Sequence, residues 1–433
     1  MVYVTPIIGG MLADRILGQR KSIYIGALTM AIGQITLAFS STLSPDMLEF
    51  KQTIFYIGLG ILVCGNGFFK PNISTMVGDL YDPKDTRRDG AFTIFYMGIN
   101  IGATIGPFIA GWLGENIAWK YGFLAAAVAM IIGFTWFYLS HKALGTTGMP
   151  PKYNRERTEL ASKDSLDIFL YIIIIVGVVS GFILGWKALP DLAKHILLWS
   201  VAIVGVIYLS FSIGKNTSGK TEWSRIGVIL ILALANIFFW SGFEQAGGTF
   251  SLFARDNVNR MVGQFEIPVT WFQMINAIAI VVFAPLFAVL WGKLEKMKLN
   301  PNTPLKFGWG MLFLSIGFVV MAFANDLTKG GLIKVSPLWL VMVYILHTWG
   351  ELCLSPIGLS MVTKLSPIKL VSTMMGIWFG SIAMGNYLAQ ALKPIVEKHD
   401  LPLFWFIAGE TFVAALLLMA ISPILKKMMR GVK

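Results

Sequence analysis

The sequence predicts an all-α polytopic membrane protein, and its composition, its apolar runs and its charge distribution all point to this fold class. The 433 residues are 56% hydrophobic and 13% charged, with a mean hydropathy of +0.70. That composition is typical of membrane proteins and not of globular ones. The apolar residues gather in runs of about 20, the length that a helix needs to cross a bilayer. A lipid bilayer is therefore the expected environment.

Twelve apolar runs are long enough to cross the membrane as helices. A shorter apolar start, residues 2–13, resembles the end of a thirteenth span. The expected full spans are residues 22–40, 53–77, 92–112, 119–140, 166–187, 195–214, 226–250, 269–292, 307–325, 337–361, 373–392 and 402–424.

The Lys and Arg residues divide unequally between the two sides that these spans define. Loops on one side, with the C-terminal tail, carry 24 of the 35, and loops on the other side carry 10. Because positive charge accumulates on the cytoplasmic side, we expect residues 141–165 and the C-terminus to be cytoplasmic, in a cell (inner) membrane. This distribution accounts for the net charge of +12, so nucleic acid is not an expected partner.

Both cysteines, Cys64 and Cys353, fall inside expected spans. This placement does not fit a disulfide framework or a metal site, and small apolar packing residues are the simpler interpretation. The four histidines are scattered along the chain. We therefore expect no metal, no cofactor and no enzymatic activity.

The first apolar segment ends at Asp14 and Arg15, which are followed by Gly18, Arg20 and Lys21. Asp14 and Arg15 lie where the helix leaves the membrane, so we expect them to form a cytoplasmic gate. Any helix end with a basic loop has a similar composition. The pattern nevertheless resembles the loop between helices two and three of the major facilitator superfamily, with one extra residue between Arg15 and Gly18.

Two charged residues within the apolar runs are the first candidates for function. Glu244 lies in the run that begins near Ile226, and Lys70 precedes Pro71 in another. A charge at membrane depth is costly and by default marks a functional site with a partner. We expect Glu244 and Lys70 to face each other across a polar cavity. The alternative is that Glu244 is protonated or lies at a helix end.

Four motifs in chain order resemble the proton-dependent oligopeptide transporter (POT) family of the major facilitator superfamily. The fourth-helix motif is Lys-Pro-Asn, beginning at Lys70. The other three are Phe-x-x-Phe-Tyr-x-x-x-Asn-x-Gly at residues 92–102, aromatic-Trp-x-x-Phe-Glu-Gln-x-Gly at residues 239–247, and Trp-Gly-Glu-Leu-Cys-Leu-Ser-Pro-Ile-Gly at residues 349–358.

This resemblance implies a major facilitator fold with two six-helix halves and two inserted helices of the prokaryotic type. The implied domains are residues 1–140 with helices two to six, residues 141–222 with a linker and the inserted helices, and residues 223–433 with helices seven to twelve. The family's first helix, with its Glu-x-x-Glu-Arg motif, has no counterpart in the sequence. We therefore expect an upstream coding segment of at least ~25 residues, enough for one span.

The resemblance also implies roles for individual residues. Glu351 would hold the ammonium group of a peptide, Lys70 its carboxylate, and Asn100 and Asn276 its backbone. The residues expected to bind peptide are Glu351, Asn100, Asn276, Lys70, Tyr3, Trp240, Gln245, Ser355, Trp378 and Phe379.

Two further ionisable residues lie in expected spans. Glu410 is expected to be a bystander, and His347, about one helical turn from Glu351, to be a core or interfacial histidine. Asn100, flanked by Gly98 and Gly102, also fits simple helix packing through small residues.

The predicted function is proton-coupled import of di- and tripeptides by alternating access, with peptides and protons as partners and a monomeric state. The charge of a carboxyl group at membrane depth depends on burial and on nearby cations, so Glu244 beside Lys70 would suit proton coupling. The alternatives are a transporter for another small anionic or drug-like solute, and a non-transporting sensor with this fold.

Overall fold

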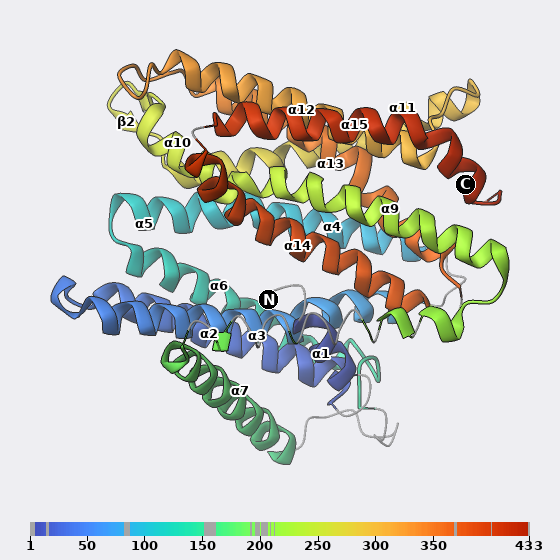
Figure 1. Cartoon of the computed structure of the whole chain (residues 1–433). Coiled ribbons are helices and arrows are strands. Elements are labelled where there is room, and N and C mark those ends of the chain that lie inside the picture. Colours follow the sequence, from blue (N-terminus) through green and yellow to red (C-terminus); the bar gives the residue numbers. More distant parts are fainter. Residues whose placement is uncertain are drawn as a thin grey trace. The chain divides into compact units, whose positions relative to one another are not determined.

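The computed structural model describes residues 5–13, 17–81, 87–150, 162–190, 193–194, 200, 207, 209–211, 213–367, 370–399 and 401–431. These residues are mostly helical (Figure 1), as the apolar runs predict. The chain divides into two compact units, residues 1–202 and 203–433. The domain boundaries expected from the sequence stay a prediction.

The first unit is a set of long apolar helices with short helical turns between them. Its elements are α1 (Thr5–Leu12), α2 (Gly18–Thr42), η2 (Pro45–Met47), α3 (Leu48–Asp79), α4 (Arg87–Gly106), the π-helical turn η3 (Pro107–Gly111), α5 (Trp112–Asn116), α6 (Trp119–Leu139), η4 (Ser140–Lys142) and α7 (Ser162–Ala188).

Close backbone approach holds α2 against α3 in the first unit. A Cβ atom built on Gly26 would lie 2.7 Å from the carbonyl oxygen of Gly65, and one built on Gly65 would lie 2.9 Å from that of Gly26. Real Cβ atoms do not come this close, so both positions require glycine. Small residues that allow such an approach are the usual means of packing helices where lipid removes the hydrophobic driving force.

Arg20 fastens the start of α2 to the segment that follows α6. Its guanidinium donates to the Gly145 carbonyl (2.6 Å) and its backbone N–H donates to the Gly148 carbonyl (3.0 Å). Arg20 is only 3% exposed. The neighbouring pair expected to form a cytoplasmic gate, Asp14 and Arg15, lies outside the described residues.

The second unit is built from long helices, one of which is interrupted in the middle of its apolar run. Its elements are α9 (Gly219–Phe243), η5 (Glu244–Gly247), α10 (Thr249–Asn257), β1 (Met261–Val262), β2 (Phe265–Glu266), η6 (Val269–Gln273), α11 (Met274–Lys296), α12 (Thr303–Leu327), α13 (Leu338–Leu365), α14 (Val371–Lys398) and α15 (Leu403–Met428).

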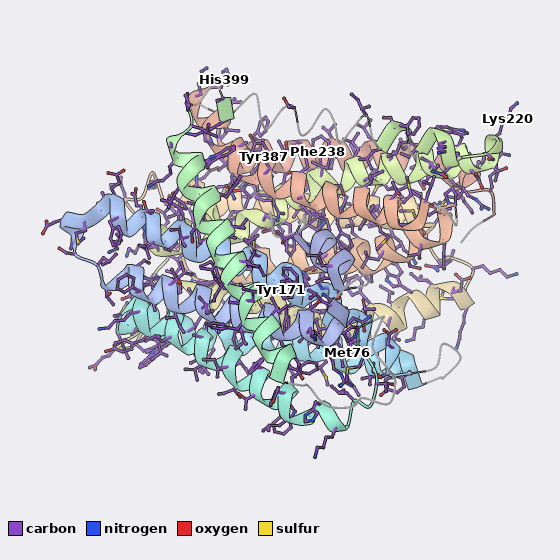
Figure 2. The ribbon with its side chains drawn as sticks, turned by 90° about the horizontal axis from the view of Figure 1, so that it is seen from below. Met76, Tyr171, Lys220, Phe238, Tyr387 and His399 are labelled. Carbon is purple, nitrogen blue, oxygen red and sulfur yellow. The ribbon has the colours of Figure 1, made fainter. Side chains whose placement is uncertain are left out.

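A continuous buried core joins the helices of the second unit. Phe239 of α9, Phe318 of α12 and Ile407 of α15 are each fully buried in it. The helices α12 and α15 lie side by side, as do α9 and α14 (Figure 1). In Figure 2, Phe238 and Tyr387 mark this second pair of neighbouring helices. The two short strands pair antiparallel in the hairpin between α10 and η6.

Ten helices of the described part of the chain are long and apolar enough to cross a membrane, so the protein is a multi-pass membrane protein. Two of the twelve expected spans are not among them. Residues 195–214 lie largely outside the described residues. Residues 373–392 do form a helix, α14, which is not among the ten.

Candidate functional site

The helix that carries the seventh-helix motif breaks at Glu244. The α-helix α9 ends at Phe243, the 3₁₀ turn η5 follows, and Gly248 (φ −118°, ψ −86°) separates it from α10. A Cβ atom built on Gly247 or on Gly248 would meet no atom of a neighbouring segment within 4 Å. An interrupted helix at membrane depth is tolerated where the freed backbone groups face protein or a cavity.

Side-chain and backbone donors form hydrogen bonds with the carbonyl groups that this break exposes. The Ala246 carbonyl accepts from the hydroxyl groups of Ser251 (3.1 Å) and Tyr344 (3.4 Å). The Gln245 carbonyl accepts from the Gly248 N–H at 3.2 Å. Hydrogen bonds from α10 and α13 therefore stabilise the break, which places the carboxyl group of Glu244 at the end of a helix.

The break forms one wall of a pocket of about 490 Å³ within the second unit. The other wall is one face of α14, with residues at positions i, i+3, i+4 and i+7, the spacing of a single helix face. The lining residues are Glu244, Gln245, Gly247, Gly248, Thr249, Leu252, Asn386, Ala389, Gln390 and Lys393.

Asn386 of α14 contacts the carboxyl group of Glu244 across this pocket. Its amide nitrogen donates to Glu244 Oε1 at 3.2 Å and to the Ile382 carbonyl at 3.2 Å, in the amide orientation that satisfies both ends of the group. Glu244 is half-buried. One adjustable amide therefore links the carboxyl group at the break to α14.

A second carboxyl group lies on α13 in a different setting. The Asn276 amide of α11 donates to Glu351 Oε2 at 2.9 Å and also to Thr348 Oγ1 at 3.0 Å. Thr348 is fully buried, and its hydroxyl donates to the Tyr344 carbonyl one turn back on the same helix. The structure thus brings together Glu351 and Asn276, which the sequence analysis assigned to the same ligand.

The two carboxyl groups of the second unit have different hydrogen-bond partners. Glu244 accepts from the Asn386 amide of α14, and Glu351 accepts from the Asn276 amide of α11. Glu244 lies at the helix break, whereas Glu351 lies within the unbroken helix α13. The second unit therefore holds two intramembrane acids in different surroundings.

The aromatic residues expected to line the site differ in their burial. Trp240 and Phe379 are half-buried. Trp378 is 2% exposed and packs edge-on against Phe307, with its ring over Gly358. That placement favours a packing role for Trp378, and its contact with a ligand stays a prediction.

Gln245 and Ser355 also differ in their surroundings. Gln245 is 2% exposed, and its amide donates to the Ala389 carbonyl at 2.8 Å and accepts from Thr249 Oγ1 at 2.5 Å. These contacts favour a structural role that fastens η5 to α14. Ser355 lies one turn beyond Glu351 on α13, and its hydroxyl makes no hydrogen bond with another described residue. Ser355 is therefore the better placed of the two for a ligand.

Two predicted site residues lie in the first unit. Lys70 is an exposed residue of α3, directly before Pro71. Asn100 of α4 is 5% exposed, and its amide donates to the Tyr96 carbonyl at 2.9 Å. Because Lys70 and Glu244 belong to different units, their pairing stays a prediction. Tyr3, expected in the pocket wall, lies outside the described residues.

His347 and Glu410 are two further ionisable residues that the sequence places in apolar runs of the second unit. His347 is 2% exposed, between the rings of Phe250 (5.6 Å) and Phe318 (4.9 Å), as a core histidine would be. Glu410 is half-buried on α15. Among the described residues, no group of three or more His, Cys, Asp or Glu side chains could hold a metal ion.

Three residues of the site were not predicted from the sequence: Asn386, Thr348 and Lys393. The spacing of Asn386, Gln390 and Lys393 was a usable signal, since it puts three polar side chains on one face of an otherwise apolar helix. Thr348 gave no such signal, because its contact with Asn276 depends on how α11 and α13 meet.

The chain matches the model of the POT family over residues 20–408. It is 35% identical over 444 residues to the peptide transporter YePEPT of Yersinia enterocolitica, covering 99% of this chain and 84% of that protein. It is 32% identical over 439 residues to a di-/tripeptide transporter of Lactococcus lactis subsp. cremoris, covering 99% and 85%.

Solved structures give the same relationship. A crystal structure of the peptide transporter POT in complex with sulfate superposes with a TM-score of 0.81 at 33% identity, covering 99% of this chain and 85% of that one. A variant of that transporter in complex with alafosfalin gives a TM-score of 0.80 at 33% identity, with the same coverage. The fold expected from the four motifs is thus confirmed.

Proposed function

The chain belongs to the POT family, and from this membership and the geometry of the second unit we propose that it is a proton-coupled symporter of di- and tripeptides. The observation that carries the proposal is the presence of two intramembrane carboxyl groups with different partners. Glu351 is held by Asn276, and Glu244 stands at a helix break beside a pocket of about 490 Å³. The family consists of transporters, so the protein is not an enzyme.

Glu351 and Asn276 suit the recognition of a peptide. A short peptide is a zwitterion with amide groups that donate and accept hydrogen bonds, and a permissive site binds these constant features instead of the variable side chains. The Glu351 carboxylate would accept from the peptide ammonium group, and Asn276 would orient that carboxylate. Lys70 and Asn100 of the first unit would then bind the peptide carboxylate and backbone.

Glu244 suits proton coupling. It lies where the helix is interrupted, in contact with the adjustable amide of Asn386. Protonation of Glu244 would remove the charge that pairs with Lys70, which would release Lys70 for the peptide carboxylate. One proton that moves inward across about 100 mV gains roughly 2.3 kcal/mol, equivalent to about a fortyfold concentration ratio.

The names of the relatives support the substrate class. Those proteins are described as a peptide transporter and as a di-/tripeptide transporter. The protein would act as a monomer in the cell (inner) membrane with its C-terminus and residues 141–165 in the cytoplasm, because most loop Lys and Arg residues lie on that side. Residues 1–140 and 223–433 would form the two halves that alternate.

Uptake into proteoliposomes tests this proposal directly. The chain would be reconstituted, and accumulation of a labelled dipeptide, a labelled tripeptide and a labelled free amino acid would be measured with and without an inward proton gradient. We expect the gradient to drive the two peptides and not the amino acid. Gradient-independent equilibration of peptide would remove the coupling, and accumulation of the free amino acid alone would remove the substrate class.

A further inference from the structure

A second pocket, of about 370 Å³, lies in the second unit away from both carboxyl groups. It is formed by the end of α11, the start of α12 and the end of α15. Figure 1 shows α12 and α15 lying side by side. Its lining residues are Glu295, Lys298, Asn300, Pro301, Asn302, Thr303, Lys306, Lys426 and Met429.

The charge of this pocket is predominantly positive. Three lysines line it, Lys298 of the turn between α11 and α12, Lys306 of α12 and Lys426 of α15. Glu295 is the acidic residue of the lining, and its carboxylate already accepts from the Asn300 amide at 2.7 Å. The three cations outnumber this single carboxylate, and an anion that enters the cavity lowers their mutual repulsion. The lining therefore favours a bound anion.

The backbone of the pocket is fixed before any ligand arrives. Asn302 caps α12, since its Oδ1 accepts from the Leu305 N–H at 2.9 Å and from the Ser422 hydroxyl at 2.7 Å. The second bond ties the start of α12 to α15. The 25-residue helix α12 directs the positive end of its dipole toward the pocket, which adds to the attraction for an anion.

The pocket lies where three membrane-spanning helices end, the part of such a helix that reaches the lipid head groups. Lys306 extends over the ring of Trp291, with Nζ 4.5 Å from the ring centroid, and tryptophan is enriched at this interface. The last residue of α11 and the first of α12 bound the turn that carries Lys298. Basic pockets between helix ends at this level are suited to phosphate-bearing head groups.

We propose that this pocket, the α11–α12–α15 pocket, binds a phosphate group carried by an anionic molecule at the membrane surface. Lys298, Lys306 and Lys426 hold the phosphate oxygens, and the ligand joins the α11–α12 turn to the end of α15. An anionic phospholipid supplies this group from the bilayer, and inorganic phosphate supplies it from solution. The site is independent of the transported substrate.

Native mass spectrometry of the full chain in detergent tests the proposal. The purified protein is titrated with phosphatidylglycerol, with phosphatidylcholine and, separately, with inorganic phosphate. We expect phosphatidylglycerol to bind more tightly than phosphatidylcholine, and the triple variant Lys298→Gln, Lys306→Gln, Lys426→Gln to lose about tenfold in phosphatidylglycerol affinity.

A matched control separates this pocket from a generally basic surface. Lys293, Lys296 and Lys427 lie on the same ends of α11 and α15 but do not line the pocket. The triple Lys→Gln variant of these residues removes the same charge, and we expect it to change the affinity by less than about twofold, the effect of exposed charges away from a site. The single variant Lys306→Arg keeps the cation and should keep binding, which guards against loss of folding.

The outcomes decide both the site and the source of its ligand. Loss of phosphatidylglycerol binding in the pocket variant alone supports a lipid ligand. Loss of inorganic phosphate binding in that variant alone, with lipid binding unchanged, supports a soluble ligand. Equal losses in the pocket and control variants, or no loss in either titration, overturn the proposal.

Discussion

The two carboxyl groups of the second unit differ in how firmly they are held. Glu351 lies within the unbroken helix α13, and its partner Asn276 is itself fixed by the buried hydroxyl of Thr348. Glu244 lies at the end of a broken helix, beside an open pocket, with an amide from α14 as its partner. The first arrangement maintains a charge in one position. The second leaves room for the carboxyl group to change its contacts.

The comparison indicates two ways in which the protein accommodates a carboxyl group within the membrane. A buried network whose members are all bonded is rigid and specific, which suits recognition of a constant group. A carboxyl group that contacts a neutral amide beside a cavity can change its protonation state and its contacts, which suits coupling. The predictions below test whether the two carboxyl groups have different roles, in order of decreasing expected effect.

Removal of the proton-binding capacity of Glu244 should have the largest effect. Glu244→Gln keeps the shape of the side chain and its bond with Asn386, but it cannot take up a proton. We expect proton-driven accumulation of dipeptide, about fortyfold at 100 mV for one proton, to fall to equilibration while counterflow exchange partly remains. The measurement is uptake in proteoliposomes under both conditions, and accumulation at the wild-type level would refute the coupling role.

Removal of the Glu351 charge should impair binding instead of coupling. Hydrogen bonds to charged groups contribute about 1.5–3 kcal/mol, so Glu351→Gln should weaken binding of a free dipeptide roughly tenfold or more. The N-acetylated dipeptide, which has no ammonium group, should be affected much less. Competition binding in detergent measures both ligands, and equal losses would assign Glu351 a structural role.

Loss of the Asn386 amide should affect coupling more moderately. Asn386→Ala removes a hydrogen bond to Glu244 of about 1 kcal/mol, so proton-driven uptake should slow about fivefold while counterflow changes little. Gln390→Ala is the matched control, since Gln390 is one turn away on α14 and lines the same pocket. If the control variant slowed uptake as much, the effect would belong to the pocket as a whole.

The smallest effect should come from the support behind Glu351. Thr348→Val keeps the size of the side chain but removes the acceptor of the second Asn276 bond, so dipeptide affinity should fall about threefold. Thr348→Ser retains the hydroxyl and should bind dipeptide as the unchanged protein does. The same competition assay reads both variants, and a loss in the serine variant would point to packing instead of the hydrogen bond.

Much of the fold follows from local features of the sequence. Apolar runs of membrane-spanning length predicted the helices, because each such helix satisfies its own backbone within the bilayer. The same reasoning marked Glu244 as a candidate, since an acid in an apolar run is exceptional wherever the run packs, whereas the role of Glu351 came from the resemblance to the family. The motif around Glu244 contains the glycines at which the helix breaks, although the break itself was not predicted.

The partners of those acids were decided by the tertiary structure. Asn276 meets Glu351 only because α11 packs against α13, and Asn386 meets Glu244 only because α14 packs against α9. Trp378, expected at the site, packs against Phe307 in the core, and its contact with a ligand stays a prediction. Hydrophobicity and desolvation are properties of each segment, so the sequence by itself determined which segments enter the membrane and which of their charges are costly. Hydrogen bonds between helices depend on the register and rotation of two segments far apart in the chain, and only the packed structure determines these.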